Sequence, residues 1–228
     1  MVTIGDIIVE PPADGVVIHP VKWFNSPGDV ELEIGCGKGG FLLRRAQAHP
    51  EKRLIGIEWA NKYFKYAADR MARWGIDNVR IMRTDAAHLV KHHLAPQCLS
   101  ALHVYHPDPW PKKRHHKRRL FHPEFVDAAV RVLAHGGRWA IQTDHAEYFN
   151  VIRRHILAHP ALKEIPFNAP EFGVQDEMVN TNFEIKYQRQ GRIFHRLAVI
   201  KCDPDHTAIS MHNSATRSEL RVPASGFC

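Results

Sequence analysis

The feature that most constrains the fold is an alternation of short apolar runs with amphipathic helix patterns between residues 29 and 201. Five of the apolar runs have strand length, and each ends in or next to a carboxylate or a glycine turn. These positions are Gly35, Glu58, Asp85, Asp108 and Asp144. Strands and helices that alternate with short connections predict a doubly wound, Rossmann-like α/β fold with a mostly parallel sheet. Ligands of such sheets bind at the carboxyl ends of the strands.

The expected strands and helices follow from these patterns. We expect strands at residues 29–34, 52–58, 78–85, 100–108, 138–144 and 192–201. We expect helices at residues 40–49, 61–75, 86–93, 122–137 and 145–158. In the second helix, Tyr63, Ala67, Met71 and Trp74 are predicted to share one face, and Gly75 is predicted to cap the carboxyl end.

Two D/T-x-x-E patterns predict capping boxes at helix amino termini. Asp144 with Glu147 is expected to start the helix that follows the fifth strand, and Thr181 with Glu184 repeats the device.

The chain is expected to have three parts. Prolines and Gly28 interrupt residues 1–29, which predicts an extended amino-terminal arm. Residues 30–202 form one domain, because 228 residues that are 44% hydrophobic can bury a sizeable core. Residues 203–228 are polar and aperiodic, which predicts a disordered tail.

Composition limits the class of protein. The four cysteines are far apart and include no C-x-x-C pair, which argues against a disulfide framework and fits a reducing cytoplasm. The amino terminus lacks the pattern of a signal peptide. No stretch approaches the roughly 18 apolar residues that a membrane helix needs.

The glycine-rich stretch ELEIGCGKGG leaves two cofactors open. Gly35, Gly37 and Gly40 fit G-x-G-x-x-G, with Glu58 further along, so a nicotinamide dinucleotide is one candidate. Glu33 favours the other, because a carboxylate repels a pyrophosphate and attracts a cationic amine. S-adenosylmethionine carries such an amine and a sulfonium, and has no phosphate.

Three strand-end acids would form a consistent set for that cofactor. Glu33 would contact the ammonium, Glu58 the ribose hydroxyls, and Asp85 the region of the adenine amino group. The alternative for each acid is that it only caps the following helix. A Walker phosphate loop is excluded, because glycine rather than Ser or Thr follows Lys38.

The stretch HPDPWPKKRHHKRR, residues 106–119, concentrates nearly all of the net charge of +7. Such a local cationic run attracts polyanions, and nucleic acid is the first candidate. Prolines on both sides of Asp108 restrict the backbone and hold this carboxylate and Trp110 in place. Trp110 could then stack on a base while the cations bind phosphates. The alternatives are an ordinary surface turn and a solvated charged loop.

No metal is expected from the histidines near this stretch. They lack the paired spacing with cysteines or acids that zinc sites use. They are His103, His106, His115, His116 and His122.

The motifs EIGCGKG, GIE, TDA, HPDPWPKKRHHKRR, QTD and TNFE occur in this order over residues 31–184. Together they resemble the bacterial TrmB-type tRNA (guanine-N7-)-methyltransferases. The resemblance implies a class I methyltransferase fold with an antiparallel last strand, and S-adenosylmethionine as cofactor. It also implies methyl transfer to N7 of a guanosine in the tRNA variable loop, with tRNA as the partner of a cytoplasmic monomer or homodimer. One departure is His106, where the family commonly has phenylalanine.

The resemblance also implies roles for individual residues. Asp108 is the implied catalytic residue. The implied cofactor-binding residues are Glu33, Gly35, Gly37, Gly39, Glu58, Asp85 and Asp108. The implied substrate-binding residues are Lys112, Asp144, Thr181, Asn182, Phe183 and Glu184. The implied RNA-binding residues are Arg114, His115, His116, Lys117, Arg118 and Arg119.

The expected chemistry needs alignment and a negative field more than a base. Guanine N7 carries a lone pair that is unprotonated at neutral pH, so no proton has to be removed from the nucleophile. A carboxylate can stabilise the positive charge that moves onto the purine. It can also accept from guanine N1–H and the 2-amino group, for which Asp108, Asp144 and Glu184 are equal candidates. The rival classes are an NAD-dependent oxidoreductase, a non-catalytic RNA-binding protein and a small-molecule methyltransferase.

Overall fold

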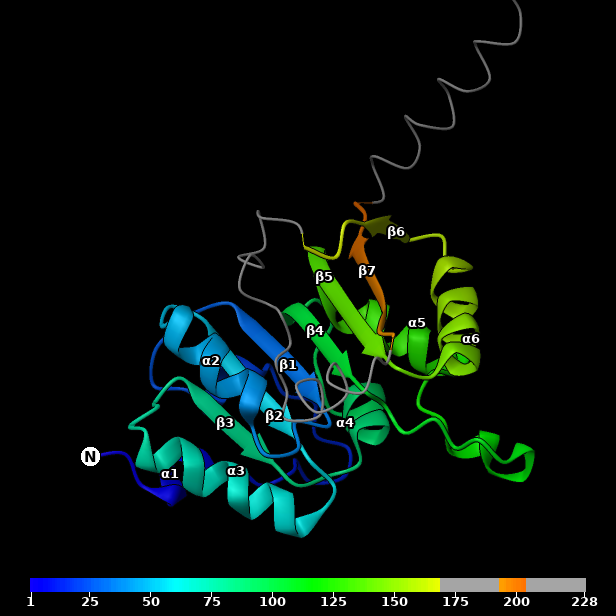
Figure 1. Cartoon of the computed structure of the whole chain (residues 1–228). Coiled ribbons are helices and arrows are strands. Elements are labelled where there is room, and N and C mark those ends of the chain that lie inside the picture. The colour runs from blue at the N-terminus through cyan, green and yellow to red at the C-terminus, as the bar shows by residue number, and fades with distance from the viewer. Residues whose placement is uncertain (169–192, 204–228) are drawn as a thin grey trace, which may run out of the picture.

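The computed structural model describes residues 1–168 and 193–203, and its centre is one twisted sheet (Figure 1). In this part of the chain the strand order is β3-β2-β1-β4-β5-β7-β6. The strands are β1 (Val30–Ile34), β2 (Arg53–Ile57), β3 (Val79–Met82), β4 (Leu99–Tyr105), β5 (Leu133–Thr143), β6 (Leu162–Ile165) and β7 (His195–Lys201). The first five pair in parallel, and β7 is antiparallel to both β5 and β6. The predicted mostly parallel sheet with an antiparallel last strand is therefore confirmed.

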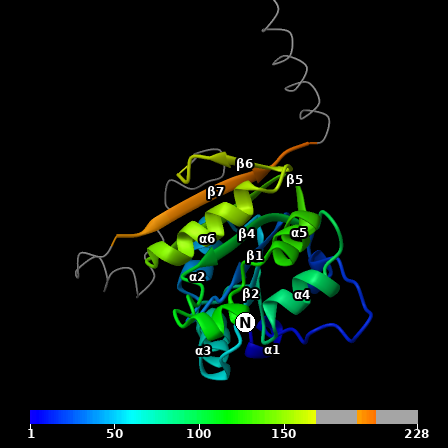
Figure 2. The ribbon, with the colours of Figure 1, turned by 90° about the vertical axis from the view of Figure 1, so that its right-hand side faces the viewer.

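Helices cover both faces of the sheet (Figure 2). The helices are α1 (Ile4–Ile7), α2 (Gly40–Ala48), α3 (Asn61–Arg73), α4 (Ala86–His92), α5 (Pro123–Val132) and α6 (Ala146–Leu157). Two short 3₁₀ helices, η1 (Pro20–Trp23) and η2 (Lys113–Arg118), lie in the connections. One hydrophobic core joins α1, α2 and α3 to β2 and β3, and a larger one joins α4, α5 and α6 to the central strands. These two cores are the doubly wound arrangement that the sequence predicted.

The buried face of α3 differs from the predicted one. Phe64, Ala67, Ala68 and Met71 are buried at the i, i+3, i+4, i+7 spacing, whereas Tyr63 is 39% exposed. Trp74, also predicted on that face, is 59% exposed, because it is the C-cap residue beyond the last helical turn.

The predicted capping glycine of α3 is confirmed. Gly75 has φ +65°, and its N–H donates to the Ala72 carbonyl over 3.0 Å. The N–H of Ile76 donates to the Met71 carbonyl over 3.0 Å, which completes a Schellman motif.

The region between α5 and β5 also departs from expectation. The helix ends at Val132, and Gly136 and Gly137 lie inside β5 rather than at the helix end. The pairing of β5 with β4 shifts register between Leu99 and Ala101, and this irregularity accommodates the extra residues. Strand β6, with its exposed Lys163 and Glu164, was not predicted.

The capping box predicted for α6 is wrong. The N-cap is His145, whose ring accepts the Tyr148 N–H over 3.2 Å, one residue beyond Asp144. Glu147 instead binds Arg119. The second predicted box, at Thr181 and Glu184, lies outside the described residues.

The amino-terminal arm packs on the domain. Thr3 and Asp6 cap α1, and the side chain of Ile7 is fully buried. Residue pairs Ile8–Ile81 and Ile18–Leu94 form isolated parallel bridges. Among the described residues, no helix has the length and apolar character needed to cross a bilayer.

Candidate active site

The glycine turn joins β1 to α2 at the carboxyl edge of the sheet. The N–H groups of Gly35 and Cys36 donate to the Ile57 carbonyl over 2.8 and 3.0 Å, which ties the turn to β2. Gly35 and Gly37 have φ +76° and +55°, and a Cβ at either would meet no atom of the described residues within 4 Å. No described residue therefore fills the space beside these two backbones. Gly39 differs from these two. A Cβ added at this position would lie 2.8 Å from Met71 Cε, so close packing on α3 explains why glycine is found here.

Glu33 is a buried carboxylate just below this turn. Its residue is 4% exposed, and among the described residues its Oε2 has no hydrogen-bond partner. The pKa of Glu33 is raised to about 8, mainly by burial; the nearby Arg44 opposes this rise and the nearby Glu58 adds to it. A buried acid without a hydrogen-bond partner is costly, and a cationic ligand would stabilise its ionised form. The amine of S-adenosylmethionine is a cation of this kind.

Glu58 fixes the turn in place. Its Oε2 accepts the Gly37 N–H over 2.9 Å, and its Oε1 accepts the Ala60 N–H at the start of α3 over 2.7 Å. A carboxylate has about four lone-pair sites, so these bonds leave capacity for the predicted ribose contact. Asp85 accepts the His88 N–H over 2.9 Å as the N-cap of α4. The capping role is thus observed for Asp85, and its adenine contact stays a prediction.

Asp108 lies just beyond β4, whose last residue is Tyr105. Its side chain is exposed, and His106 and Trp110 on either side have φ +53° and +41°, which is uncommon for non-glycine residues. The prolines at 107 and 109 leave this segment few backbone conformations. Asp108 is therefore presented to solvent by a constrained turn.

His106 joins the ends of two neighbouring strands. Its backbone N–H donates to the Gln142 carbonyl over 2.7 Å, and its Nε2 lies 3.2 Å from Gln142 Nε2. Its Nδ1 lies 4.0 Å from Asp144 Oδ1. Sequence analysis named His106 as a departure from the family pattern and as one of the histidines without a metal-site spacing; the structure shows that it links the Asp108 turn to the end of β5, which Asp144 follows.

The basic loop projects from the body beside the carboxyl ends of the parallel strands (Figure 1). The exposed cations are Lys112, Lys113, Arg114, Lys117 and Arg118. His115 and His116 are half-buried. The Arg118 guanidinium lies over the Trp110 ring, 4.9 Å from its centroid, and the His115 ring meets Trp110 edge-on at 5.9 Å. The loop thus presents a cationic surface around one aromatic ring.

Arg119 does not belong to this exposed surface. Its side chain is 4% exposed and forms two hydrogen bonds with Glu147, of 3.0 and 2.6 Å. It also donates to the Pro109 carbonyl over 2.8 Å and lies over the Tyr148 ring. The prediction that Arg119 touches RNA does not fit this geometry, in which Arg119 anchors the loop to α6. Sequence could not show this, because Arg119 has the same charge as its neighbours.

Of the predicted substrate-binding residues, the structure places two. Lys112 is exposed at the start of η2, and Asp144 follows β5 beside His106. Thr181, Asn182, Phe183 and Glu184 lie outside the described residues.

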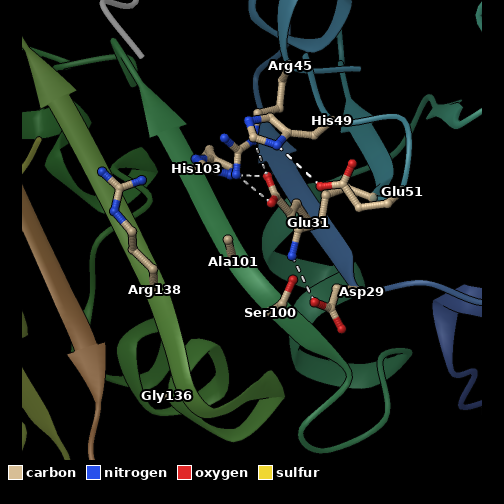
Figure 3. A pocket seen from close by; sticks show the side chains of 11 residues that line it. Asp29, Glu31, Arg45, His49, Glu51, Ser100, Ala101, His103, Gly136 and Arg138 are labelled. Atoms are coloured by element: carbon tan, nitrogen blue, oxygen red, sulfur yellow. Dashed lines mark hydrogen bonds and ion pairs between the residues drawn. The ribbon is translucent and has the colours of Figure 1, made fainter. Parts of the chain in front are cut away.

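A second polar region lies at the opposite, amino edge of the sheet, where a pocket of about 370 Å³ opens (Figure 3). Here Glu31 accepts hydrogen bonds of 2.9 and 2.8 Å from Arg45, and its Oε2 lies 3.0 Å from His103 Nε2. Burial alone would raise the pKa of Glu31, but the contacts with His103 and Arg45 hold that pKa well below its usual range. Sequence reasoning did not identify this network. In this network Glu31 is paired with Arg45, whereas Oε2 of Glu33 has no hydrogen-bond partner among the described residues.

A doubly wound sheet with a glycine turn after β1 and acids at successive strand ends is the arrangement of class I methyltransferases. A solved S-adenosylmethionine-dependent O-methyltransferase from Thermotoga maritima shares this fold with a TM-score of 0.51 and 17% identity, over 78% of this chain and 61% of that one. The family described as "putative methyltransferase" matches residues 28–197.

Two relatives named tRNA (guanine-N(7)-)-methyltransferase match most of the chain. The one from Alkalilimnicola ehrlichii is 38% identical, over 80% of this chain and 77% of its own length. The one from Myxococcus xanthus is 34% identical, over 80% of this chain and 89% of its own length. The chain belongs to the tRNA (guanine-N(7)-)-methyltransferase family, as the sequence motifs indicated.

Proposed function

We propose that the protein transfers a methyl group from S-adenosylmethionine to N7 of a guanosine in tRNA, forming 7-methylguanosine. The observation that carries the proposal is the buried carboxylate of Glu33 below the glycine turn, whose Oε2 has no hydrogen-bond partner among the described residues, at the sheet edge from which the basic loop projects. Membership of the tRNA (guanine-N(7)-)-methyltransferase family supports tRNA as the substrate. The proposed partner is tRNA and the proposed location the cytoplasm, which fits the free thiols of Cys36, Cys98 and Cys202.

The residues at this edge supply binding and alignment. When bound, S-adenosylmethionine supplies an electrophilic methyl group. Glu33 holds a cationic amine, and the backbone turn at Gly35 and Gly37 allows close approach. Asp108 adds negative charge beside the reacting purine, which gains positive charge during transfer. No residue needs to remove a proton, because N7 of guanine already carries a lone pair.

Among the described residues, Asp108 and Asp144 are the candidates for recognising the guanine base. Both follow adjacent strands, and His106 connects them. Either carboxylate can accept from N1–H and the 2-amino group together, a pair of bonds worth about 1–3 kcal/mol of base discrimination.

The exposed cations of the basic loop would bind tRNA phosphates. Replacing both Lys117 and Arg118 with glutamine is expected to weaken tRNA binding and to reduce the slope of log affinity against log salt by about 0.7–0.9 per lost contact. Filter binding at several salt concentrations measures this slope. Replacing exposed Arg73 on α3 with glutamine is the matched control and should leave the slope unchanged.

Arg119→Gln provides a contrast within the same loop. Because Arg119 is buried against Glu147, this variant should lower the melting temperature, whereas the Lys117/Arg118 double variant should not. If the slope of log tRNA affinity against log salt were unchanged in the double variant, Lys117 and Arg118 would not be phosphate contacts.

The direct test supplies labelled methyl donor and unmodified tRNA to the protein, digests the RNA, and separates the nucleosides. We expect label in 7-methylguanosine. Donor binding without any RNA label would favour a small-molecule methyltransferase, and binding of a nicotinamide dinucleotide in place of the methyl donor would favour the oxidoreductase.

A further inference from the structure

Three side chains that the proposed reaction does not use converge where the amino-terminal arm meets α4. They are Asp14 from the arm, His88 from within α4, and His93 at its C-cap. One ligand atom from each lies within 4.8 Å of the others. Sequence analysis did not single out these three residues, because Asp14 is far from His88 and His93 along the chain. The fold brings them together.

Hydrogen bonding prepares one of these imidazoles for a cation. His93 is 3% exposed, and its Nδ1 lies 2.9 Å from the Val16 carbonyl oxygen. A carbonyl can only accept, so Nδ1 carries the ring proton and Nε2 presents a lone pair. This arrangement, with one ring nitrogen held by a backbone carbonyl and the other directed at the site, is the usual one for a metal-binding histidine.

The spacing of the two imidazoles suits a tetrahedral ion. Nε2 of His93 lies 3.1 Å from Nε2 of His88. Zinc–nitrogen bonds of about 2.0–2.1 Å at tetrahedral angles place two ligand nitrogens about 3.3 Å apart. The observed separation is therefore within a few tenths of an ångström of the one expected for two nitrogens that share a zinc ion.

We propose that Asp14, His88 and His93 bind one Zn²⁺ ion, with water in the fourth position. Two imidazoles and a single carboxylate select a borderline transition ion over Mg²⁺ or Ca²⁺, which prefer oxygen ligands. The earlier expectation of no metal, drawn from other histidines, does not cover this cluster.

The ion would fasten the arm to α4. The Ile18 N–H already donates to the His93 carbonyl over 2.8 Å, and the Ala95 N–H donates to the Ile18 carbonyl over 3.0 Å. Because Asp85, beside the candidate active site, is the N-cap of α4, the ion would also hold the opposite end of the helix that this acid caps.

The test is zinc titration of the full chain after removal of metals with a chelator, read by calorimetry and by the metal content of the dialysed protein. We expect the His88→Ala variant to bind one equivalent less than the wild type. The matched control, His155→Ala on α6, should bind as the wild type does. Comparing variants makes the result independent of any zinc bound elsewhere on the chain.

Two further measurements address the role of Asp14 and the folding of the variants. Asp14→Asn should weaken the site at least tenfold, whereas Glu10→Gln, which removes another exposed acid of the arm, should not. Zinc should raise the melting temperature of the wild type and leave that of His88→Ala unchanged. His88 and Asp14 are exposed, so both variants should fold. Equal zinc stoichiometry and affinity in the wild type and His88→Ala would overturn the proposal and leave a simple hydrogen bond between the two histidines.

Discussion

Asp108→Asn is expected to slow methyl transfer by about 10²- to 10³-fold, the usual loss when one preorganised electrostatic group is removed. The substitution keeps the size of the side chain and removes the charge. Because Asp108 is exposed and held by a constrained turn, the fold should not depend on that charge. The loss should therefore appear in the chemical step.

Single-turnover kinetics with saturating donor and tRNA measure that step, and calorimetry measures donor affinity. Donor affinity should stay within a few-fold, since Glu33 and the glycine turn are unchanged. Asp127→Asn, which removes an exposed carboxylate from α5, is the control and should react at the wild-type rate. A wild-type rate in Asp108→Asn would end the assignment of Asp108 as the catalytic residue.

The fold was predictable because its signals are local and repeated. Apolar runs gave five parallel strands, and Gly75 was found to cap α3 as its position indicated. Errors arose where two neighbouring residues compete for one role: His145 caps α6 in place of Asp144, and Phe64 is buried in place of Tyr63. Such choices depend on tertiary packing, which periodicity does not contain.

The sequence predicted which types of residue form the candidate site. It predicted less well whether each of their side chains is buried or exposed. The sequence placed Glu33 beside the glycine turn, but could not show that its carboxylate is buried without a partner among the described residues. It grouped Arg118 with Arg119, yet one lies over Trp110 at the surface and the other is buried against Glu147. The charge of a side chain follows from the sequence, whereas its exposure to solvent depends on the elements that pack around it.

Glu33→Gln is expected to weaken binding of S-adenosylmethionine by about 10²-fold, because it removes the buried acid that we propose pairs with the amine. In the wild type, affinity should rise with pH up to about 8, as the raised pKa of Glu33 allows its carboxylate to ionise. Above that, the free amine of the donor loses its own proton, and affinity should fall. Calorimetry between pH 6 and 9 should show no rise on the acidic side in Glu33→Gln.

The same substitution should have the opposite effect on the stability of the cofactor-free protein. The folded protein keeps a proton on Glu33 up to about pH 8, whereas the unfolded chain loses it near 4.5, so the wild type loses stability as pH rises between these values. Glu33→Gln lacks this penalty and should gain on the order of a few kcal/mol relative to the wild type by pH 8. Denaturant unfolding at pH 5 and pH 8 measures the difference, with Glu124→Gln, at an exposed position on α5, as control. If the difference in unfolding free energy between the variant and the wild type were the same at pH 5 and pH 8, Glu33 would ionise normally. The argument that burial of Glu33 selects a cationic ligand would then fail.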